Sequence, residues 1–458
     1  MRRFVRSLAI VVCVVVPPVC EAQGADEAEG TFSIVARDPA TGELAMAVQS
    51  KAFAAGNRAI TVKGGLAVIA HQAAANPMYG TLGLELLRAG LTPQQALDQL
   101  IRSDEGRDSR QVTILDAQGR TATWTGRGAN DWKGHRCGEN YCAQGNILVG
   151  PGVVDALATS FEGSKGPLAE RLLAALDAAQ AAGGDARGTQ SAALVVTRPL
   201  GGAGGFSDRA IDIRVDDARA PLVELRRLLE LVRSGEAVGE ANRRLAAGDV
   251  AGALAAAEAA CARAPSNDVA WTTLAATLLR ADRRADALDA AHRAIDLNAA
   301  NRRQLPKQPA FAALADDEGF RRLVAEPGAA PSPRATDADL QRVLADYVGL
   351  YARDALARWY ALFLPTFSAT FTNADGTTTA RGLDDFYARQ RALFDGGHAV
   401  REELRQLRVV RQGPIATATA DFTFHDDERS PPGKLSLQLV ESGGRFRIAS
   451  LVFTYHAP

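Results

Sequence analysis

Residues 31–217 alternate between strand-like and helix-like patterns in an order that few folds can accommodate. The predicted strands cover 31–37, 43–50, 58–63, 66–72, 111–117, 121–126, 191–198 and 210–217, and the predicted helices cover 79–90, 92–104, 150–164 and 167–184. Strands and pairs of helices in this order predict two sheets sandwiched between two helix layers, an αββα architecture.

The charge balance and the first 30 residues limit the partners and the location that can be predicted for the protein. The chain of 458 residues carries 52 Lys and Arg against 53 Asp and Glu, a balance that excludes nucleic acid and an anionic membrane as predicted partners. Residues 1–22 have a basic start and an apolar run, Leu8–Val16, typical of a cleaved signal peptide. Residues 23–30 form a polar leader. We therefore predict an exported protein, periplasmic or extracellular, that leaves the membrane after cleavage.

The rest of the chain predicts an α+β multidomain protein. After the domain at 31–231, residues 232–326 are rich in Ala, Arg and Leu and repeat with a period of 34 residues, so that Leu254 aligns with Leu288. This region resembles a tetratricopeptide pair, which implies binding of a protein or peptide partner. Because two such repeats rarely bury a core alone, we expect the pair to lean on a neighbouring domain. Residues 327–339 form a linker rich in proline and small residues.

Residues 340–458 begin with a helical pattern and end in long strands. They resemble the SnoaL-like or ketosteroid-isomerase-like α+β cone, and the residues that carry the resemblance are Trp359, Tyr360, Gly376, Arg381, Gly382 and Phe386. The resemblance implies a domain that dimerises or holds a small apolar ligand, and a homo-oligomer is therefore among the expectations.

The cysteines and histidines of the mature chain have no metal-binding spacing, and no metal or cofactor is predicted. Cys137 and Cys142 lie five residues apart. They could pair across a tight loop in an oxidising compartment or remain two reduced thiols, and the sequence leaves both open.

Five blocks of the amino-terminal region resemble the family called domain of unknown function 1028. They are the stretches 31–51, 72–80, 144–150, 168–194 and 211–217. The resemblance covers about 31–231 and implies grouping with the N-terminal nucleophile (Ntn) hydrolases, which have an αββα sandwich. The family's own activity is not established.

Gly30-Thr31 is the kind of bond that proteasome-type subunits of this class cleave in themselves. An Ntn enzyme needs a hydroxyl or thiol beside its own free α-amine, which acts as general base with a pKa of about 8. Thr31 is the predicted nucleophile, and Ser33 lies on the same strand face. Lys63 stands 32 residues after Thr31, where such relatives have a lysine that lowers the pKa of the nucleophile.

Two asparagines are candidate oxyanion donors, because they lie in stretches predicted as loops. Asn76 could instead form an Asx turn before a helix, and Asn146 could satisfy buried backbone. Lys63 could be a solvated hairpin residue, and Thr31 could simply begin a strand. The acid expected on the second strand is missing, since that strand offers Ala47 and Gln49.

The sequence thus supports two functions. The first is an exported Ntn-type amidohydrolase of unknown substrate, with Thr31 as nucleophile. The second is a non-catalytic exported scaffold that binds a partner or a small ligand through its tetratricopeptide-like and SnoaL-like regions. A third, minor alternative places ketosteroid-isomerase chemistry on Asp375 and Tyr360.

Overall fold

A computed structural model describes residues 30–325, 335–373, 375–426 and 430–455. The predicted signal peptide, residues 23–29 of the leader and residues 327–334 of the linker lie outside these ranges. The chain forms two compact units that divide between Leu225 and Arg226, within helix α6 (Pro221–Ala246). Each unit is described separately below.

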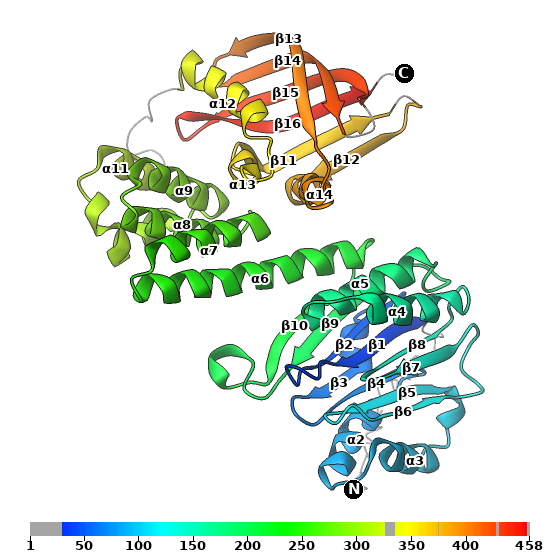
Figure 1. The fold of residues 1–458 in the computed structure, drawn as a ribbon. Coiled ribbons are helices and arrows are strands. Elements are labelled where there is room, and N and C mark those ends of the chain that lie inside the picture. The colour runs from blue at the N-terminus through cyan, green and yellow to red at the C-terminus, as the bar shows by residue number, and fades with distance from the viewer. Residues whose placement is uncertain (1–29, 326–334, 374, 427–429, 456–458) are drawn as a thin grey trace, which may run out of the picture. The chain divides into compact units, whose positions relative to one another are not determined.

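The first unit contains two antiparallel sheets (Figure 1). The six-stranded sheet has the order β10-β9-β2-β1-β8-β7, with bounds β1 (Thr31–Arg37), β2 (Leu44–Ser50), β7 (Gly134–Gly138), β8 (Tyr141–Asn146), β9 (Ser191–Thr197) and β10 (Arg209–Val215). The four-stranded sheet has the order β3-β4-β5-β6, with bounds β3 (Ile60–Lys63), β4 (Ala67–Ala73), β5 (Arg110–Asp116) and β6 (Thr121–Thr125).

The sheets pack face to face because alternate residues of their central strands are apolar. Val35 of β1 and Val68 of β4 belong to one buried cluster between the sheets. Helices α4 (Gly152–Gly163) and α5 (Leu168–Ala181) cover the outer face of the six-stranded sheet, and α2 (Met78–Arg88) and α3 (Pro93–Ser103) cover that of the four-stranded sheet (Figure 1). Short helices α1 (Ala55–Ala59), η1 (Arg107–Ser109) and η2 (Ala203–Gly205) complete the unit.

The hairpin β7–β8 is absent from the predicted elements. Residues 134–146 are rich in glycine and polar side chains and lack a clear apolar alternation, so no element was predicted over 134–143, and 144–146 were predicted as loop. The turn is made by Asn140, whose φ of 62° lies in the left-handed region that asparagine tolerates. Asn146 is therefore the last residue of a buried strand, which corrects its predicted place in a loop.

Helices fill the first part of the second unit. They are α7 (Val250–Arg263), α8 (Asp268–Arg280), α9 (Arg284–Leu297), α10 (Asn301–Gln304) and α11 (Glu318–Val324), with 3₁₀ helices η3 (Leu305–Lys307) and η4 (Pro309–Leu314). Their shared core is built mainly from alanines, which let the helices approach closely, together with Trp271, Phe311 and Phe320. No helix in the described part of the chain is long and apolar enough to cross a membrane.

A third sheet forms the end of the second unit, in the order β12-β11-β16-β15-β14-β13. Its elements are α12 (Asp337–Gly349), α13 (Leu356–Tyr360), β11 (Phe363–Thr372), β12 (Thr378–Gly382), α14 (Leu383–Asp395), β13 (Arg401–Gln412), β14 (Ile415–His425), β15 (Pro432–Ser442) and β16 (Arg445–Tyr455). Helices and strands enclose an aromatic core that includes Trp359 and Phe386. The predicted mixed α+β, multidomain class is confirmed.

Helix α9 is bonded to this third sheet through buried guanidinium groups. Arg293 Nη1 of α9 donates to the carbonyl of Phe363 in β11 at 2.8 Å, and Arg447 Nη2 of β16 is 3.2 Å from Asp296 Oδ2 of α9. The helical region therefore packs against the third sheet within the second unit.

Candidate functional site

The space between the two amino-terminal sheets changes from apolar to polar at the end where β1 begins. Polar side chains from four strands of the two sheets, together with the end of β2, gather there, and each is at most 4% exposed: Thr31, Ser33, Ser50, Gln72, Gln111, Thr113, Gln144 and Asn146. Burying this many polar groups is costly unless they bond to one another. We therefore expect the members of this cluster to be hydrogen-bonded to one another.

A chain of hydroxyl groups surrounds the Gly30–Thr31 bond. Thr31 Oγ1 donates to Ser50 Oγ at 3.1 Å, and Ser50 Oγ donates in turn to the carbonyl oxygen of Gly30. Arg187 Nη2 donates to the same carbonyl oxygen at 3.0 Å. The carbonyl before Thr31 thus has two donors, one of them a cation, and the Thr31 hydroxyl is connected to it by two hydrogen bonds through Ser50.

Asp185 supplies a buried carboxylate at this bond. It comes from the connection between α5 and β9, and its side chain is fully buried. Its oxygens accept hydrogen bonds from Lys51 N at 2.9 Å and from Arg187 Nη2 at 2.9 Å. The ion pair fixes the guanidinium that reaches the Gly30 carbonyl.

Ser33 and Asn146 join the same cluster through two glutamines. Ser33 Oγ donates to Gln72 Oε1 at 2.6 Å, and Gln72 Nε2 donates to the carbonyl of Thr31 at 3.2 Å. Asn146 stands opposite Thr31 in the β1–β8 register and donates to Gln111 Oε1 at 3.2 Å. The structure therefore brings together three of the five predicted site residues, namely Thr31, Ser33 and Asn146.

Lys63 lies at the other end of the four-stranded sheet. It pairs with Ala67 across β3 and β4, five residues before Gln72, which corresponds to roughly 16 Å along the strand. Its Nζ is 3.0 Å from Asp208 Oδ2, and half of its side chain is exposed. The structure does not bring Lys63 to Thr31; the cation at the Gly30–Thr31 bond is Arg187.

Asn76 belongs to a neighbouring cluster at the start of α2. Its Oδ1 accepts from Met78 N at 3.1 Å, which is an Asx turn. Close by, Asp104 accepts from Tyr79 Oη and Arg110 Nε, and the hydrogen bond from Arg110 lowers the pKa of Asp104 to about 2. This geometry gives Asn76 a structural role and no contact with Thr31.

The strand positions expected to carry an acid face away from the cluster. Gln49 Nε2 donates to Gln180 of α5, so Gln49 and Ala47, which shares its face of β2, point toward the helix layer. Ser50 lies on the opposite face, toward the other sheet. The buried carboxylate comes instead from Asp185, which is 154 positions after Thr31 in sequence.

Sequence reasoning did not single out Ser50, Gln72, Gln111, Asp185 or Arg187. Four of them lie in the blocks that carry the family resemblance, since Ser50 falls in 31–51, Gln72 in 72–80, and Asp185 and Arg187 in 168–194. Those blocks were the available signal. Their meeting depends on contacts between residues far apart in sequence.

Cys137 and Cys142 stand opposite one another on β7 and β8 and form a disulfide. Within the described residues, no three His, Cys, Asp or Glu side chains gather closely enough to hold a metal ion. Asp375 lies in an exposed turn where it accepts from Thr377, whereas Tyr360 is buried and donates to Asp384 at 2.7 Å. The two residues named for isomerase chemistry are therefore apart.

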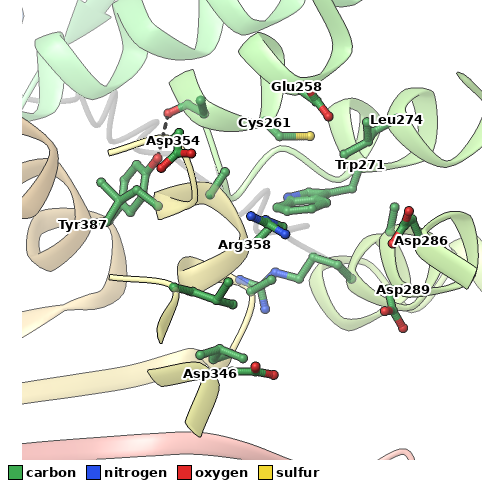
Figure 2. Close-up of a pocket in the computed structure, with 18 of the residues that line it drawn as sticks. Glu258, Cys261, Trp271, Leu274, Asp286, Asp289, Asp346, Asp354, Arg358 and Tyr387 are labelled. Carbon is green, nitrogen blue, oxygen red and sulfur yellow. Dashed lines mark hydrogen bonds between the residues drawn. The ribbon is translucent and has the colours of Figure 1, made fainter. Parts of the chain in front are cut away.

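The second unit contains a cavity of about 1180 Å³ between its helices and its sheet (Figure 2). Nine arginines and seven acidic side chains line it among the described residues. Most of these arginines are paired, as Arg283 is with Asp286 at 2.7 Å. Arg358 has no hydrogen-bond or ion-pair partner in the described part of the chain, and Figure 2 shows its guanidinium pointing toward the indole of Trp271.

These observations define an α+β protein whose buried polar cluster gathers at the first residue of a central strand. The model of the family of unknown function DUF1028 matches residues 31–225, and that of the SnoaL-like domain matches residues 340–457. A DUF1028 protein of known structure from Silicibacter pomeroyi is 32% identical over 44% of this chain and 85% of its own, with a TM-score of 0.41. The chain therefore belongs to the DUF1028 family and carries a SnoaL-like domain at its other end.

Structures similar to the carboxyl-terminal part share less sequence. A cystatin-like protein of unknown function from Nostoc punctiforme is 12% identical over 27% of this chain and 94% of its own, with a TM-score of 0.22. An NTF2-like protein of unknown function from Shewanella baltica is 13% identical over 27% and 94%, with a TM-score of 0.21. No curated protein matches the chain.

Proposed function

We propose that the protein is an exported amidohydrolase of the Ntn type, which cleaves its own Gly30–Thr31 bond and then uses Thr31 as nucleophile. The observation that carries this proposal is the pair of donors, Ser50 Oγ and Arg187 Nη2, on the carbonyl that precedes the Thr31 hydroxyl. The packing of two sheets between two helix layers agrees with the αββα sandwich of that class.

The contacts suit self-cleavage. In this scheme Thr31 Oγ1 attacks the Gly30 carbonyl carbon, and the negative charge that develops on the carbonyl oxygen is stabilised by Ser50 and Arg187. The carbon–nitrogen bond breaks, and the hydroxyl proton passes to the nitrogen. The ester that joins Gly30 to Thr31 is then hydrolysed by water, which releases Gly30 as a carboxylate and leaves Thr31 with a free α-amine.

The same groups would serve an amide substrate. The new α-amine, with a pKa near 8, can take the proton of the Thr31 hydroxyl at neutral pH. Ser33 and Asn146 hold the strand end through Gln72 and Gln111, so they are positioning residues in this scheme. Arg187 replaces Lys63 as the cation beside the nucleophile.

Export is proposed from residues 1–22, and the Cys137–Cys142 disulfide supports it. Structural disulfides persist in oxidising compartments such as the periplasm or the extracellular space. The proposed enzyme would therefore meet its substrate outside the cytoplasm.

The test is the amino-terminal residue of the protein recovered from its native compartment. The intact mass should correspond to a chain that starts at Thr31, and the Thr31→Ala variant should keep its leader. A wild-type chain that starts at Gln23 would contradict the mechanism.

The cavity of the second unit favours a second candidate function, the binding of a peptide by the tetratricopeptide-like helices and the SnoaL-like domain. Arg358 is a charge without a partner among the described residues, and Trp271 offers a buried ring beside it. A peptide array probed with the full chain should identify ligands that Arg358→Ala binds roughly tenfold more weakly. Equal binding by the variant would place the peptide elsewhere.

A further inference from the structure

The α-carbon of Gly30 lies directly against the carboxylate of Asp185. A Cβ atom built on Gly30 would stand 2.7 Å from both Asp185 oxygens and 2.8 Å from its Cγ. Real Cβ atoms do not approach other atoms this closely, because overlap at this range is strongly repulsive. At this position any residue other than glycine requires Asp185 to move.

Asp185 is held too firmly to move easily. Its oxygens accept from Lys51 N at 2.9 Å, from Arg187 N at 3.0 Å and from the Arg187 guanidinium at 2.9 and 3.2 Å. A buried carboxylate that leaves such donors loses all of them at once. The Asp185 carboxylate is therefore fixed in place and cannot move aside as the end of a flexible side chain would.

The same ion pair touches the carbonyl and the α-carbon of Gly30. Arg187 Nη2 donates both to Asp185 and to the Gly30 carbonyl oxygen. The group that would stabilise charge on the carbonyl is thus fixed to the group that limits the space beside it. A movement of the Asp185 carboxylate would therefore also displace Arg187, which is an oxyanion donor.

We infer that the acyl site admits only acyl groups with an unsubstituted α-carbon, so that the substrates are glycyl amides and Asp185 determines this specificity. The inference rests on the proposed Ntn function. In that mechanism the nucleophile and the oxyanion donors are the same for self-cleavage and for a substrate, so the acyl group of the substrate occupies the place that Gly30 occupies before the cut.

Self-cleavage of the full chain directly tests the steric limit that Asp185 sets beside residue 30. Gly30→Ala should slow formation of the Thr31 amino terminus roughly 10- to 100-fold, as measured by intact mass over time. Asp185→Ala alone should slow cleavage, because it removes the ion pair that fixes Arg187, but in that background Gly30→Ala should slow cleavage by no more than about twofold further. Asp185→Asn keeps the volume of the side chain, so in that background Gly30→Ala should still slow cleavage roughly 10- to 100-fold, which makes it the matched control. Circular dichroism would check that each variant folds.

A substrate panel tests the same subsite in trans. The processed wild-type protein should hydrolyse the aminomethylcoumarin amide of glycine roughly 10- to 100-fold faster than those of alanine and leucine, and Asp185→Ala should narrow that ratio. Equal rates for the glycyl and alanyl amides would overturn the inference.

The outcomes separate this inference from the function on which it rests. A wild-type chain that is never cut at Gly30–Thr31 overturns both. A wild-type chain that is cut, with Gly30→Ala cut at the same rate, leaves the Ntn function standing and overturns the role of Asp185.

Discussion

At the scale of single residues, Ser50 distinguishes catalysis from the mere burial of polar groups. Its hydroxyl accepts from Thr31 and donates to the Gly30 carbonyl, so it lies between the proposed nucleophile and the developing oxyanion. Loss of one oxyanion donor slows acyl transfer by roughly 100- to 1000-fold. We expect Ser50→Ala to slow self-cleavage by that factor, measured by intact mass after synthesis.

Thr197→Ala is the matched control for this prediction. Thr197 is also a buried hydroxyl of the six-stranded sheet, but it donates to the carbonyl of Leu44 at the far end of β2. Its loss should cost stability and leave the rate of self-cleavage unchanged. If both variants slowed cleavage equally, the effect of Ser50 would have to come from stability alone.

At the scale of elements, the pattern of side chains predicted those helices and strands whose formation depends on residues close together in sequence. Strand β1 has its predicted bounds, 31–37, and α3 (Pro93–Ser103) was predicted over 92–104, where Thr92 caps the helix and Pro93 occupies its first position. The hairpin β7–β8 was not predicted, because tertiary packing and a disulfide compensate for its weak local propensity. Asp185 and Arg187 were not predicted for the same reason, because their roles depend on contacts between residues far apart in sequence.

Helix α2 packs so closely on β3 that Gly80 has no room for a side chain. A Cβ atom there would lie 2.0 Å from Thr61 Oγ1, whereas one on Gly163 of α4 would meet nothing within 4 Å. We expect Gly80→Ala to lower the free energy of unfolding of the first unit by roughly 1–3 kcal/mol, while Gly163→Ala raises it slightly. Urea unfolding would measure both, and equal effects would contradict the packing argument.

At the scale of the whole molecule, the two units should respond to pH in opposite directions. Burial lowers the pKa of His71 in the first unit from 6.5 to about 4, so its neutral form stabilises the fold above pH 6.5 and this contribution is lost as the pH falls toward 4. Burial raises the pKa of Glu402 in the second unit from 4.5 to about 7. Its protonated form is favoured in the fold, so stability is highest below pH 4.5 and is lost as the pH rises through 7.

Calorimetry of the full chain at pH 7 and pH 5 should therefore show two unfolding transitions that shift in opposite senses. Between these values the first unit should lose roughly 2 kcal/mol and the second should gain a similar amount. His71→Gln should remove the shift of the first transition only, because glutamine stays neutral. Glu402→Gln, which resembles the protonated acid, should remove only the second. Transitions that move together in the wild type would show that other groups dominate the pH dependence.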